Sequence, residues 1–484
     1  MSNYKGIHRS SILVVIVLIA VFLPGCGLFG DSHNSAGNGD KQTVEEQPIV
    51  RFEGEPSKAV SSVFTTSREL SLTFNGMGDD KTMKQLLDEL DRYQIKATFF
   101  LPGMRVAEEP EIAKEILSRG HEIANNTLNR LDMTKLSYEE IYKEIQVSNE
   151  IIEKETGIRP QYIRTRSGDY NENVRLAAAQ AGMQAVVSYS LNLQAWHLDS
   201  KEDVGEYVRS YVTRGGIIAL NTEGNSQAVD TIPLIAEAAA DVKYKLVPLS
   251  KLLEKGMERK PLESIAGYDT AKINLNYKDA KYKAVDRGNP NSKEIALTFD
   301  DWGYDFTVTK ILDLLDVYKV KSTFFLRANG VEKNPNLAKA IAEAGHDVAN
   351  HTYSHPVITK LTPEQLQEEV VKAHQIITEA IQQKPTMLFR PPTGEIDDTA
   401  AKVVAATGYT TIALYNVTAL DWDVSHSADD IIRIITEKTE NGSVILLHML
   451  DHIHTLEALP TVIKELRAKG YTFVTMSDML DMKE

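Results

Sequence analysis

Short apolar stretches alternate with amphipathic ones along most of this chain. Residues 294–299 (EIALTF) have the length and the aromatic and β-branched content of a buried strand, and residues 322–326 (STFFL) form a second such run. Between them, residues 307–320 (TVTKILDLLDVYKV) place apolar side chains at helical spacing. This order of strand, helix and strand predicts parallel strands joined by crossover helices, and therefore an α/β sheet or barrel.

The same pattern occurs twice in the sequence. LTFNGMGDD begins at residue 72 and LTFDDWGYD begins at residue 297, an offset of 225 residues. Over residues 73–101 and 298–326, 15 of 29 aligned positions are identical, and GHEIANNT later aligns with GHDVANHT at the same offset. Self-similarity at a fixed long period indicates a duplicated domain. The strand ends of each copy should carry its functional residues, because active sites of parallel α/β folds lie there.

The repeat and the composition of the connecting stretches divide the chain into five predicted segments. At 484 residues the chain is long enough for two domains of ordinary size. We predict a signal segment at 1–26, a flexible polar tether at 27–56, a first domain at 57–254, a linker at 255–281 and a second domain at 282–484.

Composition narrows the class of protein and its partners. Hydrophobic residues make up 42% and charged residues 25% of the chain, which is the balance of a folded globular protein. Acidic residues outnumber basic ones by 68 to 53, giving a net charge of -15. Such a charge repels a phosphate backbone, so nucleic acid is excluded as an expected partner.

The N-terminus has the features of an export signal. Lys5 and Arg9 precede a 12-residue apolar run, Ile12 to Leu23, which is shorter than the roughly 20 residues of a spanning helix but fits a signal core of about 7 to 15 residues. Cys26 is the one cysteine of the chain, so no internal disulfide can form. LPGC resembles a bacterial lipobox, and this resemblance implies lipidation of Cys26 and attachment of the protein to the outer face of the membrane. A cleaved or uncleaved signal with an incidental cysteine is the alternative.

Residues capable of acid, base or ligand chemistry gather at predicted strand ends of the second copy. Asp300 and Asp301 follow one strand, His351 and His355 lie four residues apart, and His448 ends another strand. Two imidazoles and a carboxylate with a position left open for water are typical of a catalytic zinc site. The remaining aspartate can act as a general base, and His448 can protonate a leaving group.

Five short motifs of the second copy, taken in order, resemble those of the polysaccharide deacetylases of carbohydrate esterase family four. They are TFDD (298–301), HTYSH (351–355), RPPTG (390–394), DW (421–422) and LLH (446–448). The resemblance implies two tandem distorted (β/α) barrels, and hydrolysis of N-acetyl groups on N-acetylhexosamine units. It also implies one divalent metal ion as cofactor, zinc first, with cobalt, nickel or manganese as alternatives.

The resemblance assigns roles residue by residue. It implies Asp300 as base, Arg390 as the residue that orients it, His448 as acid, Asp421 as the residue that tunes His448, Asp301, His351 and His355 as metal ligands, and Trp422 and the backbone N–H of Thr393 as groups that contact substrate. Arg390 should also keep the Asp300 carboxylate ionised.

Three residues depart from the family pattern. Thr393 stands where tyrosine is common, Met449 follows the acid histidine where aspartate is frequent, and Trp302 replaces the usual glycine. None of them removes a catalytic atom. The changes at Thr393 and Met449 leave the substrate open.

The first copy lacks the proposed chemistry. Its residues at the positions of Asp300, Asp301, His351, His355 and His448 are, in that order, Asn75, Gly76, Asn126, Arg130 and Asn221. These residues offer no ionised ligand, and Arg130 places a fixed cation near the expected metal position. The first domain is therefore predicted to be a degenerate copy.

Two roles remain open for the first copy. Arg164 and Trp196 survive at the positions of Arg390 and Trp422, and Arg130 could pair with a carboxylate on an acidic sugar or peptide, which favours glycan binding. Alternatively, the domain only stabilises or spaces the second one, since a fold by itself implies no function.

The leading hypothesis is a membrane-anchored, metal-dependent N-deacetylase of an envelope polysaccharide, with peptidoglycan N-acetylglucosamine as the expected substrate. An O-deacetylase of the acetylxylan esterase type uses the same residues, and a non-catalytic glycan-binding lipoprotein is the alternative from another class. A zincin protease is excluded because HTYSH lacks the glutamate of H-E-x-x-H. The sequence leaves the oligomeric state open.

Overall fold

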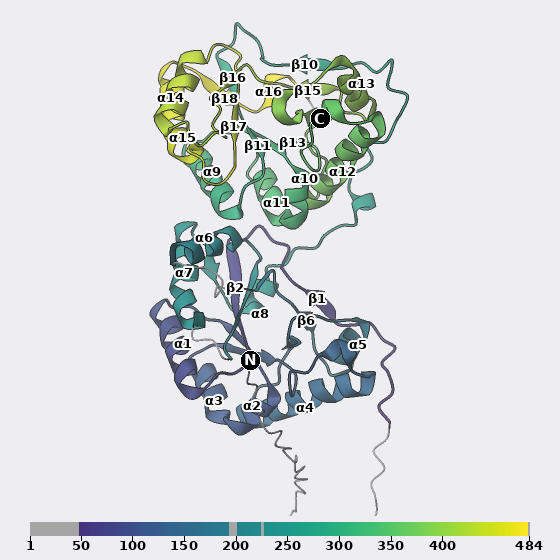
Figure 1. Ribbon diagram of the computed structural model, residues 1–484, viewed down its shortest axis with the longest axis vertical. Coiled ribbons are helices and arrows are strands. Elements are labelled where there is room, and N and C mark those ends of the chain that lie inside the picture. Colours follow the sequence, from purple (N-terminus) through teal and green to yellow (C-terminus); the bar gives the residue numbers. More distant parts are fainter. Residues whose placement is uncertain (1–47, 193–200, 224–226, 483–484) are drawn as a thin grey trace, which may run out of the picture. The chain divides into compact units, whose positions relative to one another are not determined.

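The computed structural model of the protein describes residues 48–192, 201–223 and 227–482. Val50–Glu484 form one compact unit. In each repeat the strands are surrounded by helices (Figure 1). The predicted signal segment, Cys26 and most of the predicted tether lie outside the described residues, as does Trp196.

The strands of the first repeat form a parallel sheet with β2 at its centre. Its strands are β1 (Lys58–Val60), β2 (Glu69–Asn75), β3 (Thr98–Leu101), β4 (Glu122–Asn125), β5 (Tyr162–Ile163), β6 (Ala185–Val187), β7 (Leu191–Asn192), β8 (Ile217–Asn221) and β9 (Lys245–Leu246). Its helices are α1 (Asp80–Arg92), α2 (Gly103–Glu108), α3 (Pro110–Ser118), α4 (Tyr138–Thr156), α5 (Glu172–Gln180), α6 (Lys201–Tyr211), α7 (Gln227–Asp241) and α8 (Leu249–Leu253).

The second repeat has the same succession of elements. Its strands are β10 (Lys283–Val285), β11 (Glu294–Asp301), β12 (Thr323–Leu326), β13 (Asp347–Asn350), β14 (Leu388–Phe389), β15 (Thr411–Ala413), β16 (Val417–Thr418), β17 (Val444–His448) and β18 (Thr472–Val474). Its helices are α9 (Asp305–Val317), α10 (Ala328–Lys333), α11 (Pro335–Glu343), α12 (Pro363–Ile381), α13 (Asp398–Ala406), α14 (Ala428–Lys438), α15 (Thr455–Ala468) and α16 (Met476–Met479).

The two sheets have identical topology. The strand order is β1-β6-β5-β4-β3-β2-β8-β7 in the first and β10-β15-β14-β13-β12-β11-β17-β16 in the second, with β9 and β18 paired to β2 and β11. The strand pairs within both sheets are parallel. The predicted tandem α/β architecture is therefore confirmed, and the open strand order matches an incompletely closed barrel.

Local sequence explains where the main elements pack and stop. The strand TFFL is fully buried in both repeats, and Phe324 stacks on Phe299 at 5.0 Å between ring centroids. The long helix α12 begins with a capping box, in which Thr362 and Gln365 each bond the other's backbone N–H. It ends at Gln382, which takes a left-handed conformation (φ 60°).

The predicted linker packs onto the second repeat. Within residues 255–281, the Asn274 backbone N–H donates to the Gln367 side chain on α12 (2.7 Å), and the Gly267 carbonyl lies 2.9 Å from His374 Nε2. Ala271 is buried in a cluster with side chains of α12 and α13. This stretch is thus part of the fold of the second repeat as well as the connection to it.

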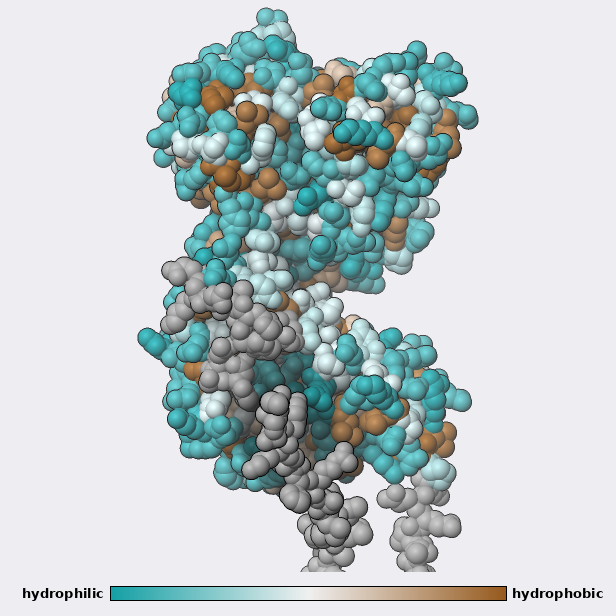
Figure 2. Space-filling view, viewed as in Figure 1, coloured by the Kyte–Doolittle hydropathy of each residue, from teal (hydrophilic) through white to brown (hydrophobic). Residues whose placement is uncertain are grey.

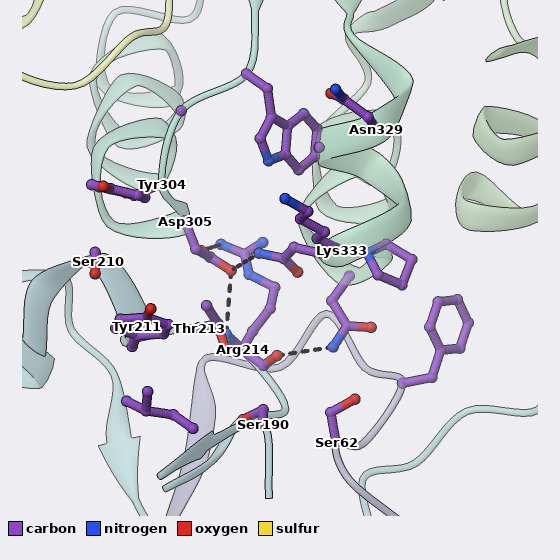
Figure 3. Close-up of a pocket in the computed structure, with 18 of the residues that line it drawn as sticks. Ser62, Ser190, Ser210, Tyr211, Thr213, Arg214, Tyr304, Asp305, Asn329 and Lys333 are labelled. Carbon is purple, nitrogen blue, oxygen red and sulfur yellow. Dashed lines mark hydrogen bonds and ion pairs between the residues drawn. The ribbon is translucent and has the colours of Figure 1, made fainter. Parts of the chain in front are cut away.

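Residues of the two repeats meet at a buried polar contact (Figure 3). The Asp305 carboxylate accepts hydrogen bonds from the Tyr244 hydroxyl (2.5 Å) and the Arg214 backbone N–H (3.2 Å), and forms an ion pair with the Arg214 side chain (3.2 Å). The Asn336 side chain donates to the Arg214 carbonyl (2.9 Å). Phe306 packs against the core of the first repeat. The contact combines apolar burial with satisfied charges.

One face of the described residues is largely hydrophilic (Figure 2). Hydrophilic side chains dominate the face in Figure 2, with hydrophobic residues in small separate patches. Among the described residues, no helix has the length and apolar content needed to cross a membrane.

Candidate active site

Four parallel strands of the second repeat end at the same edge of the sheet. Asp300 and Asp301 close β11, and Asp300 pairs in register with His448 at the end of β17. His351 directly follows β13, and Arg390 directly follows β14. Because parallel strands present their carboxyl ends at the same edge, residues far apart in the sequence come together there.

Three side chains form a cluster with the composition of a metal site. Potential ligand atoms of Asp301, His351 and His355 lie within 4.8 Å of one another, and His355 Nε2 is 3.4 Å from Asp301 Oδ1. His351 Nδ1 lies 2.8 Å from the Arg390 carbonyl, which orients the ring and leaves Nε2 to face the aspartates. Burial lowers the pKa of His351 to about 3, so this imidazole is neutral and can act as a ligand.

The backbone around this cluster is unusual. Asp301 and His355 both have left-handed conformations, with φ of 77° and 65°. Non-glycine residues rarely adopt such angles, and strained conformations of this kind concentrate at functional sites. The turn of HTYSH is fixed by Glu369 on α12, which accepts from the Ser354 backbone N–H (2.8 Å).

Asp300 is the carboxylate next to the cluster. Its Oδ1 accepts a hydrogen bond from the Arg390 guanidinium at 2.7 Å. Arg390 also donates to Thr298 Oγ1 at 2.8 Å, and its guanidinium lies over the Phe325 ring. Burial raises the pKa of Asp300, and Arg390 and His448 oppose this rise only in part. The predicted contact of Arg390 with Asp300 is present, and Arg390 lowers the pKa of Asp300 against the larger opposing effect of burial.

His448 and Asp421 form a second hydrogen-bonded pair. His448 Nδ1 lies 2.8 Å from Asp421 Oδ1, and the His448 backbone N–H donates to Asp421 Oδ2 at 2.8 Å. Thr455 also donates to Asp421, which is buried. Burial lowers the pKa of His448, but Asp421, Asp300 and Asp301 together outweigh it, so the net pKa is raised.

One cavity of about 440 Å³, within the usual size range of ligand sites, is lined by Asp300, Asp301, His351, His355 and His448. Thr393 lies at its edge in a left-handed conformation (φ 62°), and Trp422 is 53% exposed there. Sequence reasoning missed four further lining residues, because no motif contains them: Tyr415, Thr418, Leu420 and Leu450. Their position at a strand end or two residues after one was the available signal.

Two of the three departures from the family pattern lie away from this cavity. Met449 is fully buried in the hydrophobic core, and Trp302 packs on Gly330 and lines the separate cavity of Figure 3. Met449 does not line the cavity, so its substitution can affect the choice of substrate only through packing of the core. Thr393 remains the departure that lines the cavity.

The corresponding place in the first repeat holds an internal ion pair instead of potential metal ligands. The Arg130 guanidinium bonds the Glu223 carboxylate, and a Cβ added at Gly76 would lie 2.7 Å from Glu223 Oε1 and 2.8 Å from Arg130. The buried Arg164 donates to the neutral Asn75 Oδ1 (3.0 Å), and burial lowers its pKa to about 9. Within the described residues, the group of potential metal ligands found is the one in the second repeat.

Comparison with known proteins gives consistent matches to one family. The model of the family described as polysaccharide deacetylase matches residues 63–186 and 287–412, together slightly more than half of the chain. A peptidoglycan-N-acetylglucosamine deacetylase of Bacillus cereus is 38% identical over 203 residues, covering 41% of this chain and 72% of that relative.

Two further matches come from other bacilli. The peptidoglycan-N-acetylmuramic acid deacetylase PdaA of Bacillus subtilis is 31% identical over 217 residues, covering 43% of this chain and 80% of that relative. Among solved structures, a carbohydrate esterase family 4 pseudoenzyme of Bacillus anthracis is 31% identical and covers 43% of this chain and 72% of its own, with a TM-score of 0.39.

Proposed function

Because this chain belongs to the polysaccharide deacetylase family, we propose that its second repeat hydrolyses the N-acetyl group of N-acetylglucosamine units in peptidoglycan, with one divalent metal ion as cofactor. The observation that carries this proposal is the meeting of a ligand cluster, a buried carboxylate and a histidine–aspartate pair in one cavity. The choice of substrate follows from the relatives, which are named as peptidoglycan deacetylases.

The residues of the cluster fit a divalent ion of the zinc type. Asp301, His351 and His355 supply one oxygen and two nitrogens, the donor set of catalytic zinc sites, and the Arg390 carbonyl fixes the orientation of His351. A divalent ion bound there polarises the acetamide carbonyl and acidifies a water molecule. Cobalt, nickel and manganese bind the same donor atoms, so the identity of the metal has to be determined by experiment.

Proton transfer is assigned to Asp300 and to His448, which is paired with Asp421. Asp300 accepts a proton from the attacking water, whose oxygen bonds to the carbonyl carbon, and Arg390 holds the Asp300 carboxylate in place. Asp421 engages Nδ1 of His448, which leaves Nε2 to donate a proton to the amide nitrogen as the C–N bond breaks. The products are acetate and a free amine on the sugar.

Substrate contacts come from the rim of the cavity. The Thr393 backbone N–H would stabilise the tetrahedral oxyanion, and the exposed Trp422 ring would stack on a pyranose face. We further propose that the chain is exported and anchored by a lipid on Cys26 to the outer face of the cell membrane, where the tether holds the domains toward the cell wall.

Acetate release by residues 50–484 tests the reaction. Purified peptidoglycan and chitin oligomers serve as N-acetylated substrates and acetylated xylan as an O-acetylated one, before and after a chelator and after zinc is returned. We expect release from the N-acetylated substrates that the chelator abolishes and zinc restores, and none from the variant Asp301→Asn.

Two outcomes contradict the proposal. Release from acetylated xylan alone would assign an O-deacetylase. No release from any substrate by protein that contains a stoichiometric metal ion would favour a glycan-binding protein without catalytic activity.

A further inference from the structure

The first repeat has a cavity at the place that corresponds to the active site of the second. It measures about 460 Å³ and is lined by three arginines, Arg105, Arg130 and Arg166, together with Glu223 and the apolar residues Met104 and Leu128. Arg130 aligns with the proposed ligand His355. The cavity has thus been retained while its chemical character has changed from acidic and metal-binding to basic.

The charges around this cavity are not balanced. Arg105 is paired with Glu108 (2.7 Å) and Glu109 (2.9 Å), and Arg130 is paired with Glu223. Arg166 is exposed and has no ion pair or hydrogen-bond partner within the described part of the chain. The cavity is therefore lined by three arginines against one carboxylate, Glu223, and Arg166 is the arginine without a partner among the described residues.

Arg130 also has a polar atom without a hydrogen-bond partner among the described residues. Its side chain is only 13% exposed, and its Nε atom is buried without a hydrogen-bond partner among the described residues. Burial lowers the pKa of Arg130, Glu223 opposes this effect, and the nearby Arg166 adds to it, so the two guanidinium groups repel each other. A carboxylate placed between the two guanidinium groups would offset this repulsion.

We propose that this cavity binds a carboxylate group carried by an envelope glycan or by a peptide attached to it, with the carboxylate between Arg130 and Arg166. Guanidinium groups match carboxylates in geometry, and a carboxylate ligand supplies the partner that Arg166 lacks. A dianionic phosphate would leave excess negative charge next to Glu223. Met104 and Leu128 provide an apolar wall for the rest of the ligand.

This site differs from the one that the sequence suggested. The sequence pointed to Arg130 as the cation for an acidic ligand, but Glu223 already neutralises Arg130. Arg166, which aligns with Pro392 of the RPPTG motif, supplies the free charge. The inference concerns the first repeat alone and does not depend on the reaction proposed for the second.

Calorimetric titration of residues 50–484 carrying Asp301→Asn tests the site without hydrolysis of the probes. The probes are the disaccharide of N-acetylglucosamine and N-acetylmuramic acid, the neutral N,N′-diacetylchitobiose, a free tetrapeptide and inorganic phosphate. We expect at least one carboxylate probe to bind roughly tenfold or more tightly than diacetylchitobiose, as a charged hydrogen bond provides. Whether disaccharide or tetrapeptide binds identifies the source of the carboxylate.

Three variants isolate the cavity. Arg166→Gln should abolish the preference for the carboxylate probe, whereas Arg92→Gln, at an exposed arginine of α1, should leave it unchanged. Glu223→Gln should tighten binding several-fold because it frees Arg130, which a folding defect would not do. Equal affinity for charged and neutral probes, an inert Arg166→Gln substitution, or tighter binding of phosphate than of every carboxylate probe would overturn the proposal.

Failure of this site is distinguishable from failure of the deacetylase. Without the Asp301→Asn substitution, Arg166→Gln should hydrolyse neutral chitin oligomers at the rate of the unmodified protein. A loss of that hydrolysis would mean that Arg166 acts on the second repeat rather than on a ligand of the first, and would contradict the assignment.

Discussion

At the scale of single residues, His448 is not one of the three side chains that could hold a metal ion, and its ring is bonded by Asp421 instead. His448→Ala should therefore lower turnover about 10²- to 10⁴-fold, the range for loss of a general acid, while metal content stays stoichiometric. Acetate release and metal analysis of the same preparation check this. His454→Ala, at an exposed histidine paired with Glu457, is the matched control. Unchanged turnover of His448→Ala would refute its role.

Asp421 should set the pH range over which His448 stays protonated. A general acid is active below its pKa, and Asp421 raises the pKa of His448 against the effect of burial. In Asp421→Asn that pKa falls, so the basic limb of the kcat/KM profile should move to lower pH. Asp423→Asn, at an exposed residue of the same loop, should leave the limb in place. A basic limb that does not move in Asp421→Asn would assign it to another group.

At the scale of elements, the sequence was sufficient where a short motif follows a strand. TFDD and LLH predicted that Asp300 and His448 would meet, and the register of β11 and β17 pairs them directly. The duplicated pattern likewise predicted two equivalent sheets. Both predictions rest on local hydrophobic periodicity, which residues near one another in the chain determine.

Contacts between distant and unremarkable residues could not be predicted in this way. Thr298 and Thr455 support Arg390 and Asp421 through single hydroxyl groups, and threonine is common in strands and helix starts. Glu223 lies outside every aligned motif, yet it neutralises Arg130. Such pairings depend on how loops approach one another in three dimensions, which periodicity does not encode.

One buried histidine in each repeat links the stability of the strands to pH. His121 Nδ1 accepts the Ala97 backbone N–H (3.2 Å) and His346 Nδ1 accepts the Ser322 backbone N–H (3.1 Å), just before β3 and β12. Burial lowers the pKa of each to about 4. Both imidazoles are therefore neutral in the folded protein at pH values where they are protonated when unfolded.

This linkage predicts a loss of stability in mild acid. Because the folded pKa lies below the unfolded value of about 6.5, the contribution is fully present above pH 6.5 and is lost as pH falls toward 4. Between pH 7 and pH 5, His346→Gln should reduce the pH dependence of the unfolding free energy by about 2 kcal/mol. Urea unfolding at the two pH values measures this. An equal reduction in His454→Gln, which alters an exposed histidine, would contradict the assignment.

At the scale of the whole molecule, the two repeats carry different side chains at equivalent places while remaining joined. The second keeps the ligand cluster and both proton-transfer pairs, and the first has an arginine–glutamate pair at the equivalent place. Asp305 begins α9 only four residues after the proposed ligand Asp301, and its carboxylate is held by Arg214 of the first repeat. The first repeat thus contributes to the fold around the candidate active site of the second.

Removal of one partner of this contact should destabilise the protein strongly. The side chains of Arg214 and Asp305 are 3% and 0% exposed, so Arg214→Ala leaves a buried carboxylate without its counter-ion, which typically costs about 3 to 5 kcal/mol. Chemical unfolding of residues 50–484 measures the change. Lys310→Ala removes a more exposed ion pair with Asp241 between the same repeats and should cost at most about 1 kcal/mol.

The double replacement Arg214→Met with Asp305→Leu separates charge from contact. Apolar side chains of similar size remove both charges together, and such exchanges of buried ion pairs are often neutral or stabilising by about 1 to 4 kcal/mol. The double variant should therefore recover most of the stability that Arg214→Ala loses. If it is as unstable as the single variant, the Arg214 backbone N–H and the Tyr244 hydroxyl, which also bond Asp305, hold the repeats together rather than the ion pair.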